Sequence, residues 1–276
     1  MADILIDESR CVGCGECARD CLRGLLTVEG GKARLKEGQC IGCGHCVAVC
    51  PADAVRMNGC PEGEIRPYRP GEFDIAPERL LNFMEFRRSV RRFQTRPVEE
   101  EKLALLLEAA RYAPTGGNRQ ETRYILLDQR KEEITDLAIK TLSTAAGQMG
   151  NDPAQEGSQY RDSWLAMYPA WKEEGRDGLF YSAPCVLLVV ACHPQGSSGM
   201  LDAGLASDNV ELMAHALGLG VCYVGFFTRA AALEPELYRR LGVQEWERVV
   251  SAMAIGYPDV TYHRTVNRRA AQLTRL

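Results

Sequence analysis

Two cysteine runs near the N-terminus constrain what this 276-residue chain can fold into more than any other feature. Each run has the spacing C-x2-C-x2-C-x3-C, and together they comprise Cys11, Cys14, Cys17 and Cys21, followed by Cys40, Cys43, Cys46 and Cys50. Because the same spacing occurs twice in a short segment, it indicates an internally duplicated, pseudo-twofold module. The glycines between the cysteines fit a backbone that wraps closely around a bound group, since glycine tolerates positive φ.

The spacing resembles that of two-cluster bacterial ferredoxins, in which the fourth cysteine of each run serves the other cluster. Three thiolates on one tight loop can face three irons of a cubane, and the fourth iron is reached only from the partner loop. The resemblance assigns one 4Fe-4S cluster to Cys11, Cys14, Cys17 and Cys50, and the other to Cys21, Cys40, Cys43 and Cys46. The ferredoxin pattern has proline after the fourth cysteine, which Pro51 obeys and Leu22 does not, so the first loop can turn differently.

Two other interpretations of this segment stay open. A structural zinc site would use two C-x2-C pairs and would leave several thiolates over. His45 lies between two assigned ligands and could bind metal itself, or it could shape the surroundings of the cluster or face solvent.

The distribution of cysteines also predicts the domain boundaries. Nine of the twelve fall between residues 11 and 60, so we predict a ferredoxin domain at 1–60, a Pro- and Gly-rich linker at 61–76 and a second domain at 77–276. The first domain has too little apolar content to fold by hydrophobic burial alone, so its clusters should supply folding free energy. Outside the two runs, Cys60 is a reactive thiol or an ordinary exposed cysteine, and Cys185, Cys192 and Cys222 are expected core residues.

Charge and hydropathy favour small-molecule chemistry. A net charge of -4, a pI of about 5.7 and the absence of long basic runs argue against nucleic-acid binding. The sequence has neither a long apolar segment for a membrane nor a signal peptide, so we expect a cytoplasmic protein without a membrane partner.

Helical and strand patterns alternate in the second domain. Apolar spacing predicts helices over 98–112 and 203–217, the latter ended by Gly218 and Gly220. Short apolar runs predict strands over 122–127, 185–192, 221–227 and 249–255. The pattern predicts an α+β fold in which helices sandwich a small sheet.

Four segments of this domain carry candidate binding groups. On an extended backbone, Arg87, Ser89 and Arg91 would point the same way and could bind a phosphate dianion, although a basic run at a helix end can also be a solvated face. The others are the loop 113–120, the glycine-flanked segment 218–226, and the turn 256–258 with the arginines after it. Small residues and backbone amides in these segments suit a flat ring or a ribityl chain.

In this order, the four segments resemble the FMN-dependent nitroreductase family over residues 80–270. The resemblance implies a nitroreductase-type α+β sandwich, an intertwined homodimer, and two FMN sites at the subunit interface. It implies that FMN is bound by Arg87, Arg88, Ser89, Arg91, Pro114, Asn118, Gln120, Tyr223, Val224, Gly225 and Arg268, with Arg269 as the alternative to Arg268.

The combined resemblances predict an iron-sulfur flavoprotein oxidoreductase with FMN and two 4Fe-4S clusters as cofactors. Electrons would pass between the clusters and FMN to a small acceptor such as a nitroaromatic, a quinone or an activated alkene, with a ferredoxin or NAD(P)H as donor. The alternatives are an NAD(P)H-oxidising flavoprotein that sends electrons out through the clusters, and a non-catalytic redox carrier. No catalytic side chain is assigned, because the cofactors carry the chemistry.

The aromatic segment 150–182 matches no known motif. It includes Trp164, Tyr168, Trp171, Phe180 and Tyr181. It is either a helix that covers the core or a subunit interface, or a lid over the flavin that selects substrates by stacking.

Overall fold

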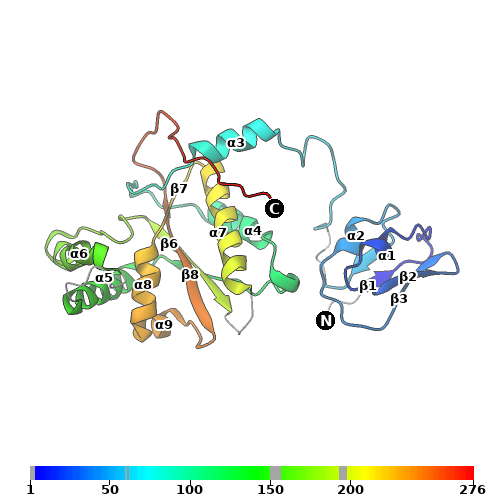
Figure 1. Cartoon of the computed structure of the whole chain (residues 1–276), viewed down its shortest axis with the longest axis horizontal. Coiled ribbons are helices and arrows are strands. Elements are labelled where there is room, and N and C mark those ends of the chain that lie inside the picture. Colours follow the sequence, from blue (N-terminus) through cyan, green and yellow to red (C-terminus); the bar gives the residue numbers. More distant parts are fainter. Residues whose placement is uncertain (1–3, 60, 62, 150–156, 193–197) are drawn as a thin grey trace. The chain divides into compact units, whose positions relative to one another are not determined.

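The computed structural model describes residues 4–59, 61, 63–149, 157–192 and 198–276, and the chain divides into two compact units (Figure 1). The first unit extends to Ile75 and includes Gly117–Arg119, and the second contains Ala76–Gly116 and Gln120–Leu276. The predicted linker 61–76 therefore falls almost entirely in the first unit. Cys60 lies outside the described residues.

The first unit is built from two short antiparallel strand pairs and two short helices. Strand β1 pairs with β4, and β2 pairs with β3 through a two-residue turn, Gly30–Gly31, in which both φ angles are positive, as a hairpin turn requires. The elements are β1 Ile4–Ile6, α1 Glu16–Asp20, β2 Leu26–Glu29, β3 Lys32–Leu35, α2 His45–Ala48 and β4 Val55–Met57. Each helix begins after a left-handed glycine, Gly15 or Gly44, so the two cysteine runs adopt matching local structures.

The core of this unit is small and rich in sulfur. Its buried apolar residues are Cys11, Cys17, Leu26, Ala33, Cys46, Ala54 and Val55. Three of these seven are proposed cluster ligands, and the partly buried residues packed against them include two more, Cys21 and Cys50. The structure therefore fits the expectation that bound clusters help to hold this unit together.

The second unit contains one antiparallel four-stranded sheet in the order β5-β6-β8-β7. The strands are β5 Arg123–Leu127, β6 Cys185–Cys192, β7 Gly220–Tyr223 and β8 Glu247–Gly256. The α-helices are α3 Pro77–Phe86, α4 Glu100–Arg111, α5 Lys131–Gln148, α6 Arg161–Glu174, α7 Gly199–Ala216, α8 Gly225–Leu233 and α9 Pro235–Leu241. Two 3-10 turns, Gly116–Asn118 and Ser158–Tyr160, complete the described elements.

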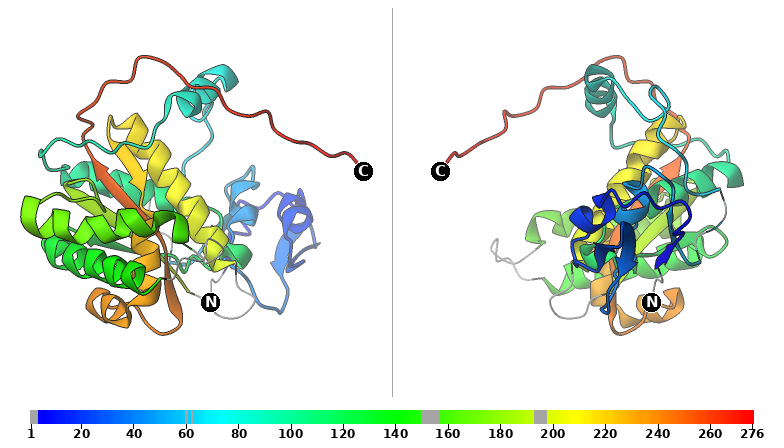
Figure 2. Two further views of the ribbon diagram at one scale, coloured as in Figure 1. Left: turned by 60° about the vertical axis from the view of Figure 1, so that its left-hand side comes forward. Right: turned by 90° about the vertical axis from the view of Figure 1, so that its right-hand side faces the viewer.

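Helices cover both faces of the sheet, as Figures 1 and 2 show for α7 on one side and α5 and α8 on the other. Alternate side chains of β6 enter two separate cores: Leu187 and Val189 pack with α4 and α7, whereas Val186 and Leu188 pack with α5, α6, α8 and α9. A strand that is buried on both faces needs apolar residues at successive positions, which explains the uninterrupted run CVLLVVAC.

The predicted α+β fold is confirmed, with shifted element ends, but the strand expected over 221–227 is partly wrong. The strand β7 ends at Tyr223, and α8 begins at Gly225. The backbone N–H of Val224 still donates to the carbonyl of Ala252 at 2.8 Å, and the chain then turns into a helix that packs Phe227 in the core. An apolar run of this length does not by itself distinguish a strand from a buried helix.

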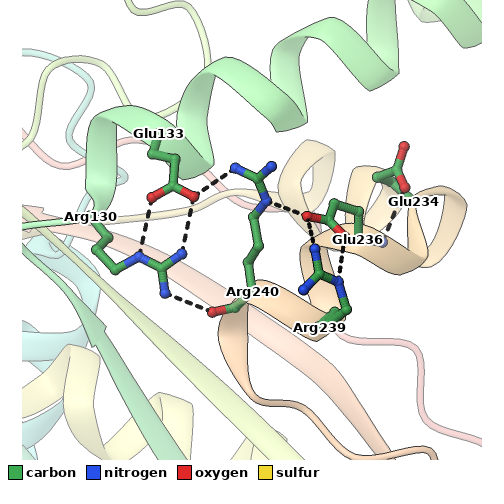
Figure 3. A network of polar contacts seen from close by, with 6 residues as sticks. All are labelled: Arg130, Glu133, Glu234, Glu236, Arg239 and Arg240. Carbon is green, nitrogen blue, oxygen red and sulfur yellow. Dashed lines mark hydrogen bonds and ion pairs between the residues drawn. The ribbon is translucent and has the colours of Figure 1, made fainter.

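An ion-pair network joins the start of α5 to α9 on the surface (Figure 3). The guanidinium of Arg240 donates to Glu133 and to Glu236, each at 2.6 Å, and Arg130 and Arg239 each bind one of these carboxylates. Exposed pairs contribute little individually, so the apolar contacts beneath them carry most of the attachment of α9.

No helix in the described part of the chain has both the length and the apolar character needed to cross a membrane.

Candidate functional site

The eight cysteines of the two runs surround two cavities in the first unit. One cavity is lined by Cys11, Cys14, Cys17 and Cys50, and the other by Cys21, Cys40, Cys43 and Cys46. Each cavity thus combines three thiols of one run with the fourth of the other run, which is the interleaved arrangement that the spacing predicts. Iron binding by these thiols stays a prediction. The structure gathers around each cavity the four thiols that a cubane requires.

The electrostatics of the thiols fit a positively charged bound group. Burial raises the pKa of Cys17, and the neighbouring thiols Cys14, Cys50 and Cys11 raise it further. Burial likewise raises the pKa of Cys46 to about 11, with Cys40 and Cys43 adding to the effect. Gathering thiolates is therefore costly unless cations, such as the irons of a cluster, offset their charge.

Backbone amides donate to several of these sulfurs. The donors to Cys11, Cys21, Cys40 and Cys50 are the N–H groups of Ala33, Leu25, Gly42 and Ala54, at 3.2–3.4 Å. The bond from Ala33 is the main reason why the pKa of Cys11 is lowered. Such bonds stabilise thiolates and would tune the potential of a cluster.

No group of three or more His, Cys, Asp or Glu side chains among the described residues is arranged to bind a single metal ion. His45 lines the second cavity, and its Nδ1 lies 3.0 Å from Oδ2 of Asp20. Each of these two residues directly precedes a proposed ligand, so the contact links the two loops that supply the second cavity.

Gly13 allows the first cysteine loop to approach the hairpin closely. Its φ is +67°, and a Cβ atom added there would lie 2.2 Å from the carbonyl oxygen of Gly31. We expect Gly13→Ala to lower the occupancy of the first cluster, measured as iron and sulfide per chain. Gly15→Ala is the matched control, since its φ is +80° but the nearest atom to its added Cβ, on Val28, is 3.8 Å away. Equal iron loss in both variants would mean that backbone strain, and not the contact with Gly31, limits assembly.

In the second unit, the arginine run leaves α3 as an extended segment fixed against β7. Ser89 forms an isolated parallel bridge with Val221, and the N–H of Val90 donates to the carbonyl of Val221 at 2.9 Å. The absence of a side chain at Gly220 makes this contact possible, because a Cβ atom there would lie 2.5 Å from Val90. The glycine-flanked segment and the arginine run are therefore brought together by close backbone packing.

Two cavities meet at Arg87 and Arg88, which line both. The first, of about 300 Å³, lies among the end of α3, the C-terminal part of α7, residues 218–221 and residues 258–262. The second, of about 500 Å³, is lined also by Met84, Glu85 and residues 265–268. The structure thus brings Arg268 to the cavity of Arg87 and Arg88, whereas Arg269 is not part of its lining.

The two cavity-lining arginines differ in their partners. The guanidinium of Arg87 donates to Oε1 of Glu211 at 2.7 Å, and Glu211 is buried. Burial raises the pKa of Glu211 against the opposing effect of Arg87. Arg88 donates from Nη1 to the carbonyl of Arg87 at 2.6 Å, while its Nη2 is buried without a hydrogen-bond partner among the described residues. A buried cationic donor without a partner at a cavity wall fits a phosphate ligand.

Ser89 and Arg91 are not in the lining of either of these cavities. Arg91 instead hydrogen-bonds Tyr181 and the sulfur of Cys222. The backbone of Tyr181 has a φ of 58° and that of Ser182 has a φ of 57°. The carboxylate of Asp177 holds this strained turn by accepting the N–H groups of Leu179, Phe180 and Ser182.

The loop 113–120 also lies outside the lining of the two cavities that Arg87 and Arg88 share. Within the second unit, the N–H of Gly116 donates to both oxygens of the buried Asp202 at 3.2 Å, and the N–H of Gln120 donates to Oγ1 of Thr115. Pro114 and Gln120 therefore sit on a loop anchored to α7. Asn118 belongs to the segment grouped with the first unit and has a φ of 54°.

The predicted trio Tyr223, Val224 and Gly225 spans the end of β7 and the start of α8. The hydroxyl of Tyr223 hydrogen-bonds Glu211, which places Tyr223 beside the Arg87 pair. Gly225 is the first residue of α8, where a backbone N–H has no acceptor within the helix and can serve a ligand.

Sequence reasoning missed Glu211, and it did not connect Tyr181 of the aromatic segment with Arg91. Glu211 gives a weak signal, because it is a charged residue on the buried side of the apolar helix α7. The sequence gives no signal for the contact between Tyr181 and Arg91, since this contact depends on a strained turn.

The described part of the aromatic segment packs into the core. Trp164 is 2% exposed and meets Phe226 edge-on, with ring centroids 5.5 Å apart. Phe180 is also buried and packs against Phe227. Residues 150–156 of this segment lie outside the described residues. This packing favours a role in covering the core over a role as a lid.

Comparison with known proteins identifies both parts of the chain. The model of the nitroreductase family matches residues 84–257, and that of a 4Fe-4S dicluster domain matches residues 4–57. A 4-nitrobenzoate reductase of Nocardioides sp. is 24% identical over 201 residues, which are 64% of this chain and 79% of that protein.

Two solved structures are similar in fold. A nitroreductase with bound FMN from Desulfitobacterium hafniense has a TM-score of 0.54 and 25% identity, and the match covers 70% of this chain and 97% of that one. A nitroreductase with bound FMN from Bacteroides fragilis has a TM-score of 0.55 and 21% identity, with 71% and 98% covered.

Proposed function

Because this chain belongs to the nitroreductase family and carries an N-terminal dicluster domain, we propose that it is an iron-sulfur flavoprotein that reduces a small acceptor. Its cofactors are FMN and two 4Fe-4S clusters. The observation that carries the proposal is the gathering of eight thiols into two interleaved sets of four in a chain whose other unit has the nitroreductase fold.

When bound, FMN exchanges one or two electrons, whereas each cluster exchanges one, so the combination converts single electrons into pairs. The acceptor class is a nitroaromatic, a quinone or an activated alkene, and we propose that electrons enter through the clusters. The protein binds and orients the flavin through the arginine run, Arg268 and the start of α8. We propose a cytoplasmic location, because a reducing compartment keeps thiols from forming disulfides and so available to clusters.

We also propose a homodimer. None of the residues of α3, all of which are described, is buried, although the helix carries apolar side chains such as Leu81 and Met84. Leu105 and Leu107 of α4 are exposed as well, and residues 263–276 form an exposed tail (Figure 2). Within the second unit, residues 113–116 and the cavities at Arg87 are separate places, and a second copy would allow one chain to complete the flavin site of the other.

An anaerobic reductive titration followed by stopped-flow spectroscopy tests the function. We expect about four electrons per chain, two for FMN and one for each cluster. Reduced ferredoxin should reduce the flavin through the clusters, whereas NADH and NADPH should leave it oxidised. Rapid bleaching of the flavin by either nucleotide alone would instead favour the NAD(P)H-oxidising alternative. Saturable turnover with nitroaromatics or quinones would separate an enzyme from a redox carrier.

A further inference from the structure

Glu211 is a buried carboxylate whose charge is compensated at the wall of the proposed phosphate cavity. It is 5% exposed, and its Oε1 accepts a hydrogen bond of 2.7 Å from Arg87. The hydroxyl of Tyr223 provides a second donor to the same carboxylate. Two donors from different segments fix the carboxylate, and a buried carboxylate of this kind needs a nearby cation.

The ion pair with Glu211 largely neutralises Arg87, so Arg87 has little net charge left to attract an anionic ligand. Arg88 lines the same two cavities, but it has no carboxylate partner among the described residues, and its buried Nη2 has no hydrogen-bond partner there either. The hydrogen bond from its Nη1 to the carbonyl of Arg87 holds the guanidinium in place without neutralising it. Arg88 is therefore the cavity-lining arginine of the run whose charge no carboxylate among the described residues offsets and whose Nη2 lacks an acceptor.

We infer that Glu211, fixed by Tyr223, is a positioning residue that neutralises Arg87 and leaves Arg88 as the main arginine for the flavin phosphate. The inference rests on the proposed function, since it concerns how this chain binds FMN. It departs from the sequence-based expectation, in which Arg87, Ser89 and Arg91 are the trio that binds the phosphate.

The ratio of the affinities for FMN and riboflavin isolates the phosphate contribution, because the two ligands differ only in that group. We would measure both by fluorescence quenching with the flavin-depleted full-length chain. We expect Arg88→Ala to lower the affinity for FMN by about tenfold to a hundredfold and to leave that for riboflavin unchanged. Arg92→Ala is the matched control from the same run, since Arg92 is exposed and pairs with Asp259, and it should not change the ratio.

Two further variants test Glu211 itself. The double variant Arg87→Met with Glu211→Met removes a neutral pair, so the ratio should stay within about threefold of wild type. Glu211→Gln keeps a hydrogen-bond acceptor for Arg87 but removes the negative charge, so the freed cation should raise the ratio severalfold. A purely structural role of Glu211 would change the melting temperature and leave the ratio unchanged.

The inference is overturned if the double variant lowers the ratio as strongly as Arg88→Ala does, or if Arg88→Ala leaves the ratio unchanged. If the double variant does not fold, Glu211→Gln still decides, since an unchanged or lowered ratio contradicts the inference. A wild-type chain that binds neither flavin would refute the proposed function, whereas a chain that binds both equally would refute only the phosphate assignment.

Discussion

A full-length chain with Cys11→Ser and Cys50→Ser should keep about four of about eight iron atoms, whereas one with Cys40→Ser and Cys50→Ser should lose nearly all. The first pair of substitutions removes two thiols from one cavity, and the second pair removes one thiol from each cavity. The contrast tests the interleaved ligand sets directly, because both variants lose the same number of thiols. Iron and acid-labile sulfide per chain, together with the low-temperature spectrum of the reduced protein, provide the measurement.

The variant without clusters should also lose the fold of the first unit. Three of the seven core residues there are cysteines, so little apolar area remains to offset the entropy of ordering the chain. We expect rapid proteolysis within residues 4–57, while bound flavin stays on the second unit, whose two cores contain none of these cysteines.

Cys192→Ser is the matched control, because Cys192 lies at the end of β6 and outside both runs. It should keep the full iron content. If Cys40→Ser with Cys50→Ser kept half of the iron and the other double variant lost all of it, each run would hold its own cluster and the interleaving would be wrong. Zinc in place of iron in wild-type protein would overturn the cluster assignment altogether.

Trp164→Ala should destabilise the second unit by about 3–5 kcal/mol, since it removes a large buried side chain and leaves a cavity. The indole packs against Phe226 and Tyr160, and a Cβ atom at Gly157 would lie 3.1 Å from it. Because these neighbours are packed closely, they can shift little to fill the cavity that the alanine leaves. Denaturant unfolding followed by near-ultraviolet circular dichroism gives the change in free energy.

Trp171→Phe provides the control within the same helix. Trp171 is only partly buried, and its Nε1 donates to Asp136 at 3.0 Å, so this change removes one hydrogen bond and should cost about 1 kcal/mol. Neither variant should alter the preference among nitroaromatic and quinone acceptors. A changed preference without a loss of stability would support a lid in place of a structural role.

Several elements of the fold follow from local sequence patterns. The helices α4 and α7 occur where the period of their apolar faces predicts them, and β6 occurs where a continuous apolar run predicts a strand buried on both faces. The end of α7 also follows from the sequence, since Gly218 has a φ of 74° and the N–H of Leu219 returns to the carbonyl of Ala214. The transition from β7 to α8 could not be predicted, because its apolar residues suit both a strand and a buried helix.

The candidate flavin site contains contacts that local sequence patterns do not predict. The sequence places Arg87, Arg88 and Arg91 in one short run, but the structure gives them different partners: Glu211 for Arg87, and Tyr181 with Cys222 for Arg91. These partners are distant in sequence, and contacts of that kind depend on how helices and strands pack. Spacing alone therefore identified the segment and could not assign roles within it.

By itself, the sequence predicted which thiols the structure gathers around each of two cavities, because the cysteines of each run lie on a tight loop whose geometry is fixed over a few residues. Only the tertiary structure decided which arginine has an open donor and which is neutralised. That difference arises because α7 places the buried carboxylate of Glu211 beside Arg87. A local sequence pattern does not predict contacts between residues that lie far apart in the chain.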